Sequence, residues 1–434
     1  MSTPSTRSFF AAARVRAASF CACIVPVIAA AHPPDQLPPA GPAFALDPAT
    51  SATIEWLEAR VAERPDDPIG VSSLAGALLR AARQTTRHDD FEKAAQAFIK
   101  LREIHPESTG ATYGLAHARL GQHRFAEALR EAQRLAFAQA ESPAVMALLG
   151  DAHLAMGNTI EASLIFDRLE QQELTLDSLA RVALVRDARG RHDDARTAMS
   201  EAVEAGKLLK VDASRIAWCE SMLGEFALAS GDLDGAEAHL RSALTGAPDM
   251  HHARFRLAEI MTRRGRIEDS ERELMALAAQ FPLPRYWIAL GEVHLLHGEE
   301  ADIKAAKELF ARAEAHMAAE VERGDLGHAR ELVEFWLAHG GDPARAAELA
   351  RRDLETVRQD AEAFEVAGWA LHHAGKHEEA RELLRLAIER NPGSARAFRR
   401  AAEISRALGQ AVEAERLSTR ARAIDPTDGR GVPR

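Results

Sequence analysis

Histidine is the abundant side chain in this sequence that could bind a metal or carry a proton, and the chain has 18 of them. Metal ligands on one helix face need i, i+3 or i, i+4 spacing. His294 and His297 have that spacing, but residues 295–296 and Gly298 beside them offer no third ligand. The adjacent histidines at 251–252 and 372–373 point about 100° apart on a helix. A metal-handling accessory protein that uses surface histidines is therefore kept as the alternative function.

Other reactive groups occur without the partners that catalysis needs. The sequence has no Gly-rich phosphate loop, no HExxH, no CxxC and no GxSxG motif. The paired carboxylates at 193–194 and 378–379 stand where second helices are expected to begin, and acids there are explained by the helix dipole. We therefore predict that the protein is not an enzyme and uses no cofactor.

Residues 363–392 show the element on which the rest of the chain is built. Small residues at 367–368 are followed by Gly375, by apolar residues at helical spacing, and by Pro392. This pattern predicts two short amphipathic helices folded back on each other. Gly375 ends the first helix because glycine enters the left-handed region without a Cβ penalty, and Pro392 cannot continue the second.

These marks return with a constant period. The same spacing separates Gly375 from Gly409, Pro392 from Pro426, and 231 from 265. A helix–turn–helix unit with this period and this small-residue pattern resembles the tetratricopeptide repeat (TPR) family, here of an exported bacterial type. The resemblance implies an all-α fold, a right-handed superhelical solenoid of about nine to ten TPR-like hairpins over residues 51–426.

Some units depart from the strict period. Extra residues near 84–90 and 299–303 are predicted to lie in turns and so on one edge of the solenoid. Gly121 is displaced by two places from the turn position of the family. Residues 54–65 look like the second helix of an incomplete first unit, and residues 427–434 form a polar tail.

The family resemblance also implies a binding surface, because first helices of successive TPR units line a concave groove. One groove position, carried over by register, is here called the ladder position. It holds Asp151, Leu184, Glu225, Glu259, Glu292, Phe335, Trp369 and Glu403. Other groove positions hold Trp218, Phe255, Arg263, His339, His372, His373, Arg399 and Arg406.

An aromatic anchor flanked by charge is the usual build of a binding hot spot. The expected partner-binding residues are Trp218, Glu225, Phe255, Glu259, Glu292, Phe335, Trp369 and His372. The alternative is a solvated acidic face whose glutamates pair with arginines of the next repeat, each pair contributing little. TPR domains that bind a C-terminal carboxylate use asparagine together with lysine or arginine in the groove. The asparagines of this chain, Asn158 and Asn391, do not stand at groove positions, so this kind of binding is not expected.

The N-terminus has the pattern of an export signal. Arg14 and Arg16 precede an apolar run at 17–31, and Ala29 and Ala31 form a small-x-small cleavage site. We predict a signal peptide at 1–31, a Pro-rich tether at 32–50, and a periplasmic or secreted protein. The alternatives are an uncleaved anchor and a lipoprotein signal that uses the cysteines at 21 and 23. The lipoprotein signal is disfavoured because Ser19 or Phe20 stands where an aliphatic residue is expected, and because apolar residues continue past both cysteines.

The charge and cysteine content restrict the partners. The net charge of −11 disfavours nucleic acid and anionic membranes, and no transmembrane segment is expected after signal removal. Cys219 is the cysteine that would remain, and it is predicted to be a buried structural thiol. The leading function is a non-enzymatic interaction scaffold in the cell envelope, whose partner is a peptide or helix segment of a protein, preferably basic.

Overall fold

The computed structural model describes residues 48–85, 88–281 and 283–427. The predicted signal peptide at 1–31, the predicted tether up to residue 47 and the tail from residue 428 lie outside the described residues. Helix formation begins at Pro48, three residues before the predicted start of the solenoid. Proline suits that place, because its fixed φ is already helical and its missing N–H is not needed in a first turn.

The described residues form 21 α-helices and no strand. The first eleven are α1 (Pro48–Glu63), α2 (Pro68–Thr85), α3 (His88–Ile104), α4 (Thr109–Gly121), α5 (Phe125–Ala138), α6 (Pro143–Ala155), α7 (Thr159–Gln172), α8 (Leu176–Ala188), α9 (His192–Leu208), α10 (Ala213–Ala229) and α11 (Leu233–Gly246). The other ten are α12 (His251–Arg263), α13 (Ile267–Gln280), α14 (Pro284–His297), α15 (Glu300–Glu322), α16 (Ala329–Ala338), α17 (Pro343–Thr356), α18 (Ala361–His373), α19 (His377–Arg390), α20 (Ala395–Ala407) and α21 (Ala411–Ile424).

From α2 onward, each even-numbered helix packs against the odd-numbered helix that follows it, and these are the first and second helices of a hairpin. Close packing within a hairpin depends on the small residue of the first helix. A Cβ atom added to Gly368 of α18 would lie 2.2 Å from Leu384 Cδ2 of α19. The periodic pattern therefore predicts the hairpins correctly. Helix α1, predicted as the second helix of an incomplete first unit, stands before them and packs against α2.

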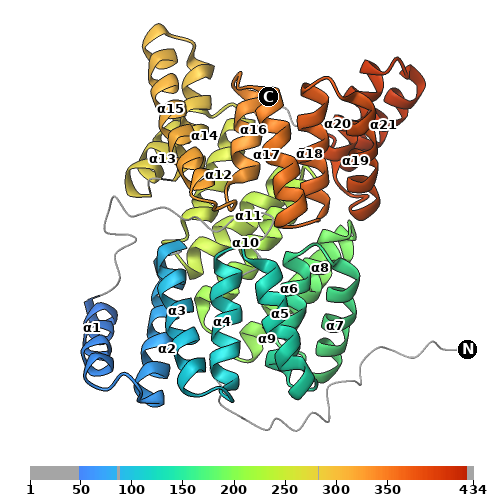
Figure 1. The fold of residues 1–434 in the computed structure, drawn as a ribbon. Helices are drawn as coiled ribbons and strands as arrows, with labels where there is room; N and C mark the ends of the chain where they lie inside the picture. Colours follow the sequence, from blue (N-terminus) through green and yellow to red (C-terminus); the bar gives the residue numbers. More distant parts are fainter. Residues whose placement is uncertain (1–47, 86–87, 282, 428–434) are drawn as a thin grey trace, which may run out of the picture.

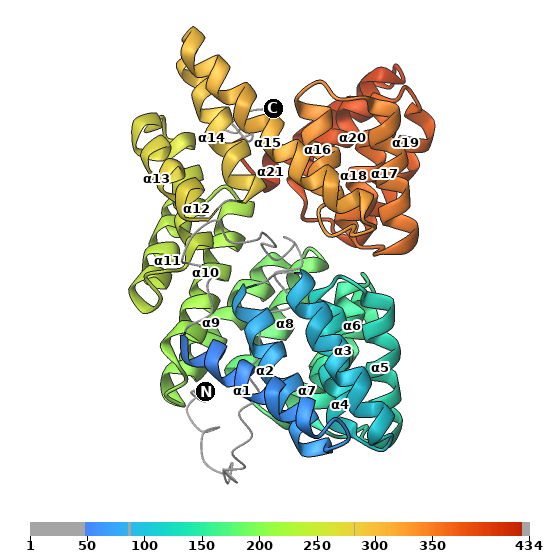
Figure 2. The ribbon, with the colours of Figure 1, turned by 60° about the vertical axis from the view of Figure 1, so that its left-hand side comes forward.

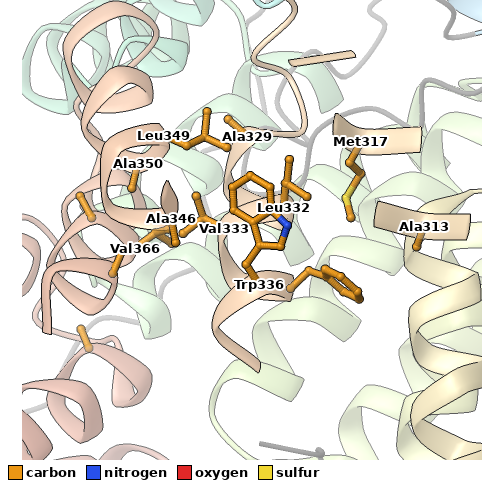
Figure 3. Close-up of a cluster of buried hydrophobic side chains, with 14 of the residues drawn as sticks. Ala313, Met317, Ala329, Leu332, Val333, Trp336, Ala346, Leu349, Ala350 and Val366 are labelled. Carbon is orange, nitrogen blue, oxygen red and sulfur yellow. The ribbon is translucent and has the colours of Figure 1, made fainter. Parts of the chain in front are cut away.

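A continuous core joins the later hairpins, and Figure 3 shows its centre around Trp336. The indole packs with Leu332 of its own helix and with Leu349 of α17, while Met317 reaches the same cluster from α15. Its Nε1 donates a hydrogen bond of 2.8 Å to Glu314 of α15. These contacts hold α15, α16 and α17 together.

The extra residues near 299–303 do not form a turn, so that prediction is wrong. Gly298 ends α14 with a φ of 76°, and α15 begins at Glu300 and runs for 23 residues. Glu300 and Asp302 in the first turn of α15 favour helix there because acids complement the positive end of the helix dipole. At 84–90, the described residues likewise belong to the end of α2 and the start of α3.

The superhelix comes round far enough for its later hairpins to lie against its earlier ones. Figures 1 and 2 both place α16–α21 next to the ends of α4–α9. The backbone N–H of Gln359, between α17 and α18, donates a 3.0 Å hydrogen bond to the carbonyl of Met156, between α6 and α7. A Cβ atom added to Gly157 would lie 2.5 Å from the backbone nitrogen of Asp360. We call this boundary between distant hairpins the seam.

The seam continues by one hairpin at a time on both sides. A Cβ atom added to Gly190, in the α8–α9 turn, would lie 2.8 Å from the backbone nitrogen of Gly393, in the α19–α20 loop. A Cβ atom added to Gly231, in the α10–α11 turn, would lie 2.5 Å from Asp425 Oδ1, just after α21. Turns of the earlier hairpins therefore meet the loops between later hairpins in a fixed register.

Turn glycines away from the seam have open surroundings. A Cβ atom added to Gly265, Gly375 or Gly409 would meet nothing within 4 Å. All of these glycines have φ between 73° and 85°, as do Gly157, Gly190 and Gly231. The left-handed turn favours glycine at each of these positions, and among these glycines close approach is a second requirement at the seam alone.

Candidate functional site

The ladder position joins successive first helices. The two carboxylate oxygens of Asp151 on α6 accept hydrogen bonds of 2.8 and 2.9 Å from Nε and Nη2 of Arg181 on α8, and both side chains are buried. Glu225 of α10 accepts bonds of 2.8 Å from His252 and 2.6 Å from Arg256, both on α12. The Asp151–Arg181 pair is bidentate and charge-assisted, and such a pair fixes geometry as well as lowering energy.

Arginines neutralise these ladder acids. Burial would raise the pKa of Glu225, but Arg256 and His252 hold it well below its usual value. Glu259 accepts a 2.6 Å bond from the same Arg256. Glu225 therefore lies in the alternative arrangement, paired with an arginine of the next repeat, whereas Glu259 pairs with an arginine of its own helix.

The partners follow a rule that the sequence contains. Arg181 and Arg256 stand three residues before the ladder residue of their own helix, and each pairs with the ladder acid one repeat earlier. Arg400 has the same place in α20, and its guanidinium lies 5.3 Å from the Trp369 ring centre. Sequence reasoning missed these arginines, although their recurrence 30 or 31 residues after an acid or aromatic at the ladder position would have revealed them.

Two ladder acids break the rule. For Glu259 the arginine's place is held by Ala289 of α14, and Arg256 of its own helix pairs with Glu259 instead. In the part of the chain that the structure describes, Glu292 on α14 has no such substitute arginine. The place from which an arginine would reach it is occupied by Leu332 of α16. Burial raises the pKa of Glu292 to about 7, with a further contribution from Glu259. Within the described residues its ion-pair partner is His339, at 3.7 Å, and burial lowers the pKa of that imidazole. Glu292 is thus a half-buried carboxyl beside a weak base.

Aromatic rings surround the imidazole that faces Glu292. The ring of His339 lies 4.1 Å from that of Phe310 and 4.8 Å from that of Phe335. Phe335 is itself buried, with 7% of its surface exposed. The predicted groove residues Glu292 and Phe335 therefore belong to one local cluster, in which Phe335 supports the imidazole and Glu292 remains partly accessible.

Trp369 is the half-buried aromatic of the ladder. Its ring stacks on His372 at 5.1 Å with an interplanar angle of 13°, and His373 meets its edge at 4.6 Å. Burial, together with His377 and His373, lowers the pKa of His372 to about 4, so that ring is neutral at pH 7. The Nδ1 atoms of His372 and His377 lie 3.1 Å apart. The predicted Trp369 and His372 thus form one aromatic surface.

The other two predicted aromatics have packing roles in the described residues. Phe255 is buried, and its ring lies 5.2 Å from that of Tyr286. Trp218 is half-buried and packs against the core around α8–α10. The structure thus distributes the predicted aromatics between core and surface, and of the four only Trp218 and Trp369 are half-buried.

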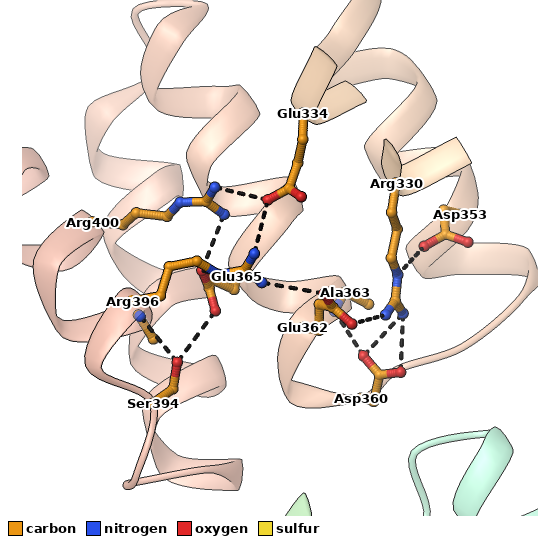
Figure 4. A network of polar contacts seen from close by, with 11 residues as sticks. Arg330, Glu334, Asp353, Asp360, Glu362, Ala363, Glu365, Ser394, Arg396 and Arg400 are labelled. Atoms are coloured by element: carbon orange, nitrogen blue, oxygen red, sulfur yellow. Dashed lines mark hydrogen bonds and ion pairs between the residues drawn. The ribbon is translucent and has the colours of Figure 1, made fainter. Parts of the chain in front are cut away.

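The charges beside Trp369 are joined in the network of Figure 4. Glu334 of α16 accepts a 2.8 Å bond from Arg400 and a 3.3 Å bond from Arg396, both on α20. Burial would raise the pKa of Glu334, but these two arginines lower it to about 2. Glu365 of α18 lies 2.6 Å from Arg396 and 3.0 Å from Arg400. These pairs link three successive first helices through their side chains.

A second centre in Figure 4 lies around Arg330 of α16. This buried guanidinium donates to Asp353 at 3.0 Å, to both oxygens of Asp360 at 2.9 and 3.0 Å, and to Glu362 at 3.1 Å. Asp360 also caps α18 by accepting a bond from the Ala363 N–H. Arg330 therefore fixes the α17–α18 loop that carries Gln359 to the seam.

The structure also places the histidines and the cysteine that were singled out in the sequence. Among the residues that the structure describes, no set of three or more His, Cys, Asp and Glu is placed to hold a metal ion. His294 and His297 both face Glu271, at 3.6 and 3.1 Å. Cys219 is buried as predicted, and burial raises the pKa of its thiol to about 12. None of the described helices is long and apolar enough to cross a bilayer.

This architecture, helical hairpins of similar length stacked into a superhelix, defines the chain as an α-solenoid repeat protein. One tetratricopeptide repeat model matches residues 86–149, 227–293 and 371–431, and a second matches residues 337–395. The chain belongs to the tetratricopeptide repeat family. Repeats of this family generally serve as scaffolds for protein–protein interaction rather than as catalysts.

Solved structures of the same kind resemble parts or most of the chain. TTC0263, a TPR protein of Thermus thermophilus, is 22% identical over 43% of this chain and 98% of its own, with a TM-score of 0.38. YrrB, a TPR protein described as having an unusual peptide-binding site, is 17% identical over 46% of this chain and 96% of its own, with a TM-score of 0.31. Yeast Tom70 is 16% identical over 87% of this chain and 88% of its own, with a TM-score of 0.37. Comparison with curated proteins gave no match.

Proposed function

We propose that this protein is a non-enzymatic scaffold of the cell envelope that holds a segment of a partner protein along its first helices, with a basic side chain of the partner at Glu292. The observation that carries the proposal is the missing arginine at Glu292. Asp151 and Glu225 each have a guanidinium from the next repeat, whereas Leu332 takes that place for Glu292.

A basic residue of a partner would complete the pattern. A lysine or arginine at Glu292 would favour the charged carboxylate, whose pKa burial has raised to about 7. The guanidinium or ammonium would also lie near the faces of the aromatic cluster, where cation–π attraction adds to the ion pair.

The stack of Trp369 on His372 supplies the apolar part of the same surface. Trp369 follows Phe335 at the ladder position one repeat later, so a peptide laid along the first helices would pass Glu292 before it reaches the indole. Tryptophan and arginine are the residue types that dominate binding hot spots. The segment that fits is therefore a basic residue followed, at some distance, by an apolar one.

Array-bound peptides can test this directly. The array would hold a set of apolar peptides, each scanned by placing one substituted residue at every position in turn. At each position that residue would be basic (lysine or arginine) in one version, glutamine in a second and glutamate in a third. The folded protein should bind a subset of the basic versions, and Trp369→Ala should weaken that binding by about 30-fold, as for a hot-spot residue. Glu292→Gln and Glu292→Arg should weaken the binding of the same basic peptides.

Glu355→Gln is the matched control, because Glu355 is an exposed carboxylate on the second helix α17. It removes the same charge away from the first helices and should leave binding unchanged. Equal binding of basic and acidic peptides, or equal loss in Glu292→Gln and Glu355→Gln, would sink the assignment of Glu292. The proposed export is tested separately, by fractionating cells that make the chain with and without residues 1–31.

A further inference from the structure

A cavity of about 910 Å³ lies at the seam, where earlier and later hairpins meet. Phe125 and Arg130 line it from α5, and Arg323, Leu326 and Arg352 line it from the segment between the end of α15 and α17. A volume of this size is in the range of natural ligand sites. Because both sides of the seam supply its walls, an occupant would touch hairpins that are distant in the sequence.

The floor of the cavity contains a strained residue. His123 stands one repeat before Gly157, at the turn position where most other hairpins have glycine, and it adopts a φ of 57°. A left-handed conformation costs a residue with a Cβ atom roughly 1–2 kcal/mol. Its buried imidazole is close to the opposite wall, since a Cβ atom added to Gly327 would lie 2.4 Å from His123 Nδ1. Backbone strain of this kind is concentrated at functional sites.

Most acids that line the cavity have a cationic partner. Asp325 lies 2.9 Å from His88 across the seam, and this pair lowers the pKa of Asp325 to about 2 although burial would raise it. Glu92 and Glu127 share Arg119, at 3.3 and 3.1 Å. Glu320 faces two histidines at 3.4 and 3.5 Å. These carboxylates therefore add little free negative charge to the site.

Three guanidiniums at the cavity are in the opposite situation. The side chains of Arg130, Arg323 and Arg352 are exposed and have no hydrogen-bond or ion-pair partner within residues 48–85, 88–281 and 283–427. Asp89, in the first turn of α3, is the cavity carboxylate in the same state. The site therefore keeps a net surplus of unpaired positive charge, in a chain whose net charge is −11.

We propose that the seam cavity binds a small polyanion with two or three carboxylate or phosphate groups, held by Arg130 from one side of the seam and by Arg323 and Arg352 from the other. Guanidinium presents its donors in a planar fork that matches both anions bidentately. The polyanion bridges the seam, and its binding therefore stabilises the closed superhelix by an amount that grows with the logarithm of its concentration above Kd. This site is separate from the surface at Glu292 and Trp369, and does not depend on the function proposed for it.

Calorimetric titration of the purified protein with citrate and with tripolyphosphate, at constant ionic strength, tests the proposal. We expect at least one of the two to bind with a stoichiometry of one. The double variant Arg323→Gln/Arg352→Gln and the single variant Arg130→Gln should each weaken binding at least tenfold. All three side chains are exposed, so these variants should keep the helical content of the parent protein.

Arg64→Gln is the matched control, because the exposed side chain of Arg64 has no hydrogen-bond or ion-pair partner among the described residues and lies outside the cavity lining. Hydrogen exchange at the Gln359 amide reports the bridging, and the bound anion should slow it in the parent protein and not in the double variant. If citrate alone binds, the site recognises carboxylate groups. If tripolyphosphate alone binds, it recognises phosphate groups. Absence of binding by both, or equal binding by parent, double variant and Arg64→Gln, would overturn the proposal.

Discussion

Replacing Gly157 with alanine separates the two demands that the structure places on turn glycines. Gly157 has a φ of 85°, and a Cβ atom there would lie 2.5 Å from Asp360 N and 2.6 Å from the carbonyl carbon of Gln359. Both are backbone atoms, so no side-chain rotation relieves the clash. Gly265 has a φ of 74° and nothing within 4 Å of the same position, so Gly265→Ala is the control.

The expected losses follow from these distances. Each substitution places alanine in the left-handed region, at a cost of roughly 1–2 kcal/mol. At Gly157 the seam must also separate locally, which removes the 3.0 Å bond from Gln359 N to Met156 O. A net hydrogen bond contributes about 1 kcal/mol, and overpacking costs a further 1–3 kcal/mol. The difference between the two variants should therefore be about 2–4 kcal/mol, all of it at the seam.

Hydrogen exchange at the Gln359 amide is the direct assay. We expect Gly157→Ala to accelerate that exchange by well over tenfold, since a local opening free energy lower by about 1.4 kcal/mol already raises the rate tenfold. Gly265→Ala should leave it unchanged, and small-angle scattering should show a larger radius of gyration for Gly157→Ala alone. Equal exchange rates at Gln359 in the two variants would refute the close packing at the seam.

Two further predictions concern buried carboxyls. Because burial raises the pKa of Glu292 to about 7 from 4.5, the stability that this group contributes to the folded state is present below pH 4.5 and is lost as the pH rises through 7. Glu292→Gln should therefore raise the unfolding free energy by about 3 kcal/mol at pH 8 and by little at pH 4.5. A difference between variant and parent that does not change with pH in denaturant titrations would contradict this. Asp151→Ala should lower stability by about 3–5 kcal/mol because it leaves Arg181 buried without its partner, whereas Asp151→Leu combined with Arg181→Met should lose much less, as a double-mutant cycle would show.

The local fold was predictable because the hairpin signals are local. Gly375, Gly409 and the helix-ending prolines recur at one period, and helix pairs form where that period predicts them. The failure at 299–303 has the same origin, since a period marks inserted residues without saying whether they extend a turn or a helix. Acidic residues at the start of α15 favour a helix over a longer turn, because they complement the positive end of the helix dipole.

The candidate site was predictable in position and less so in chemistry. The repeat register predicts that Glu225 and Trp369 lie on first helices. Both do, and each contacts an arginine on the first helix of the following hairpin. Burial of Phe255 and Phe335 depends on tertiary packing that one repeat does not specify. The seam was beyond prediction from spacing, because small rotations between successive hairpins add up before Gly157 meets Gln359. The sequence feature that marks the seam is His123, which stands at a position where most hairpins have a turn glycine.

The seam also limits how this chain can change in length. Solenoids ordinarily gain or lose whole units, because each unit contacts only its neighbours. Here the turn at Gly190 meets the loop at 391–393 and the turn at Gly231 meets residues 425–427, so the hairpins between them act as a spacer of fixed number. Removal of one hairpin from that spacer would bring every turn opposite the wrong loop. Duplication and deletion of repeats, the usual route of variation in such proteins, are therefore confined to the parts of the chain outside this closed span.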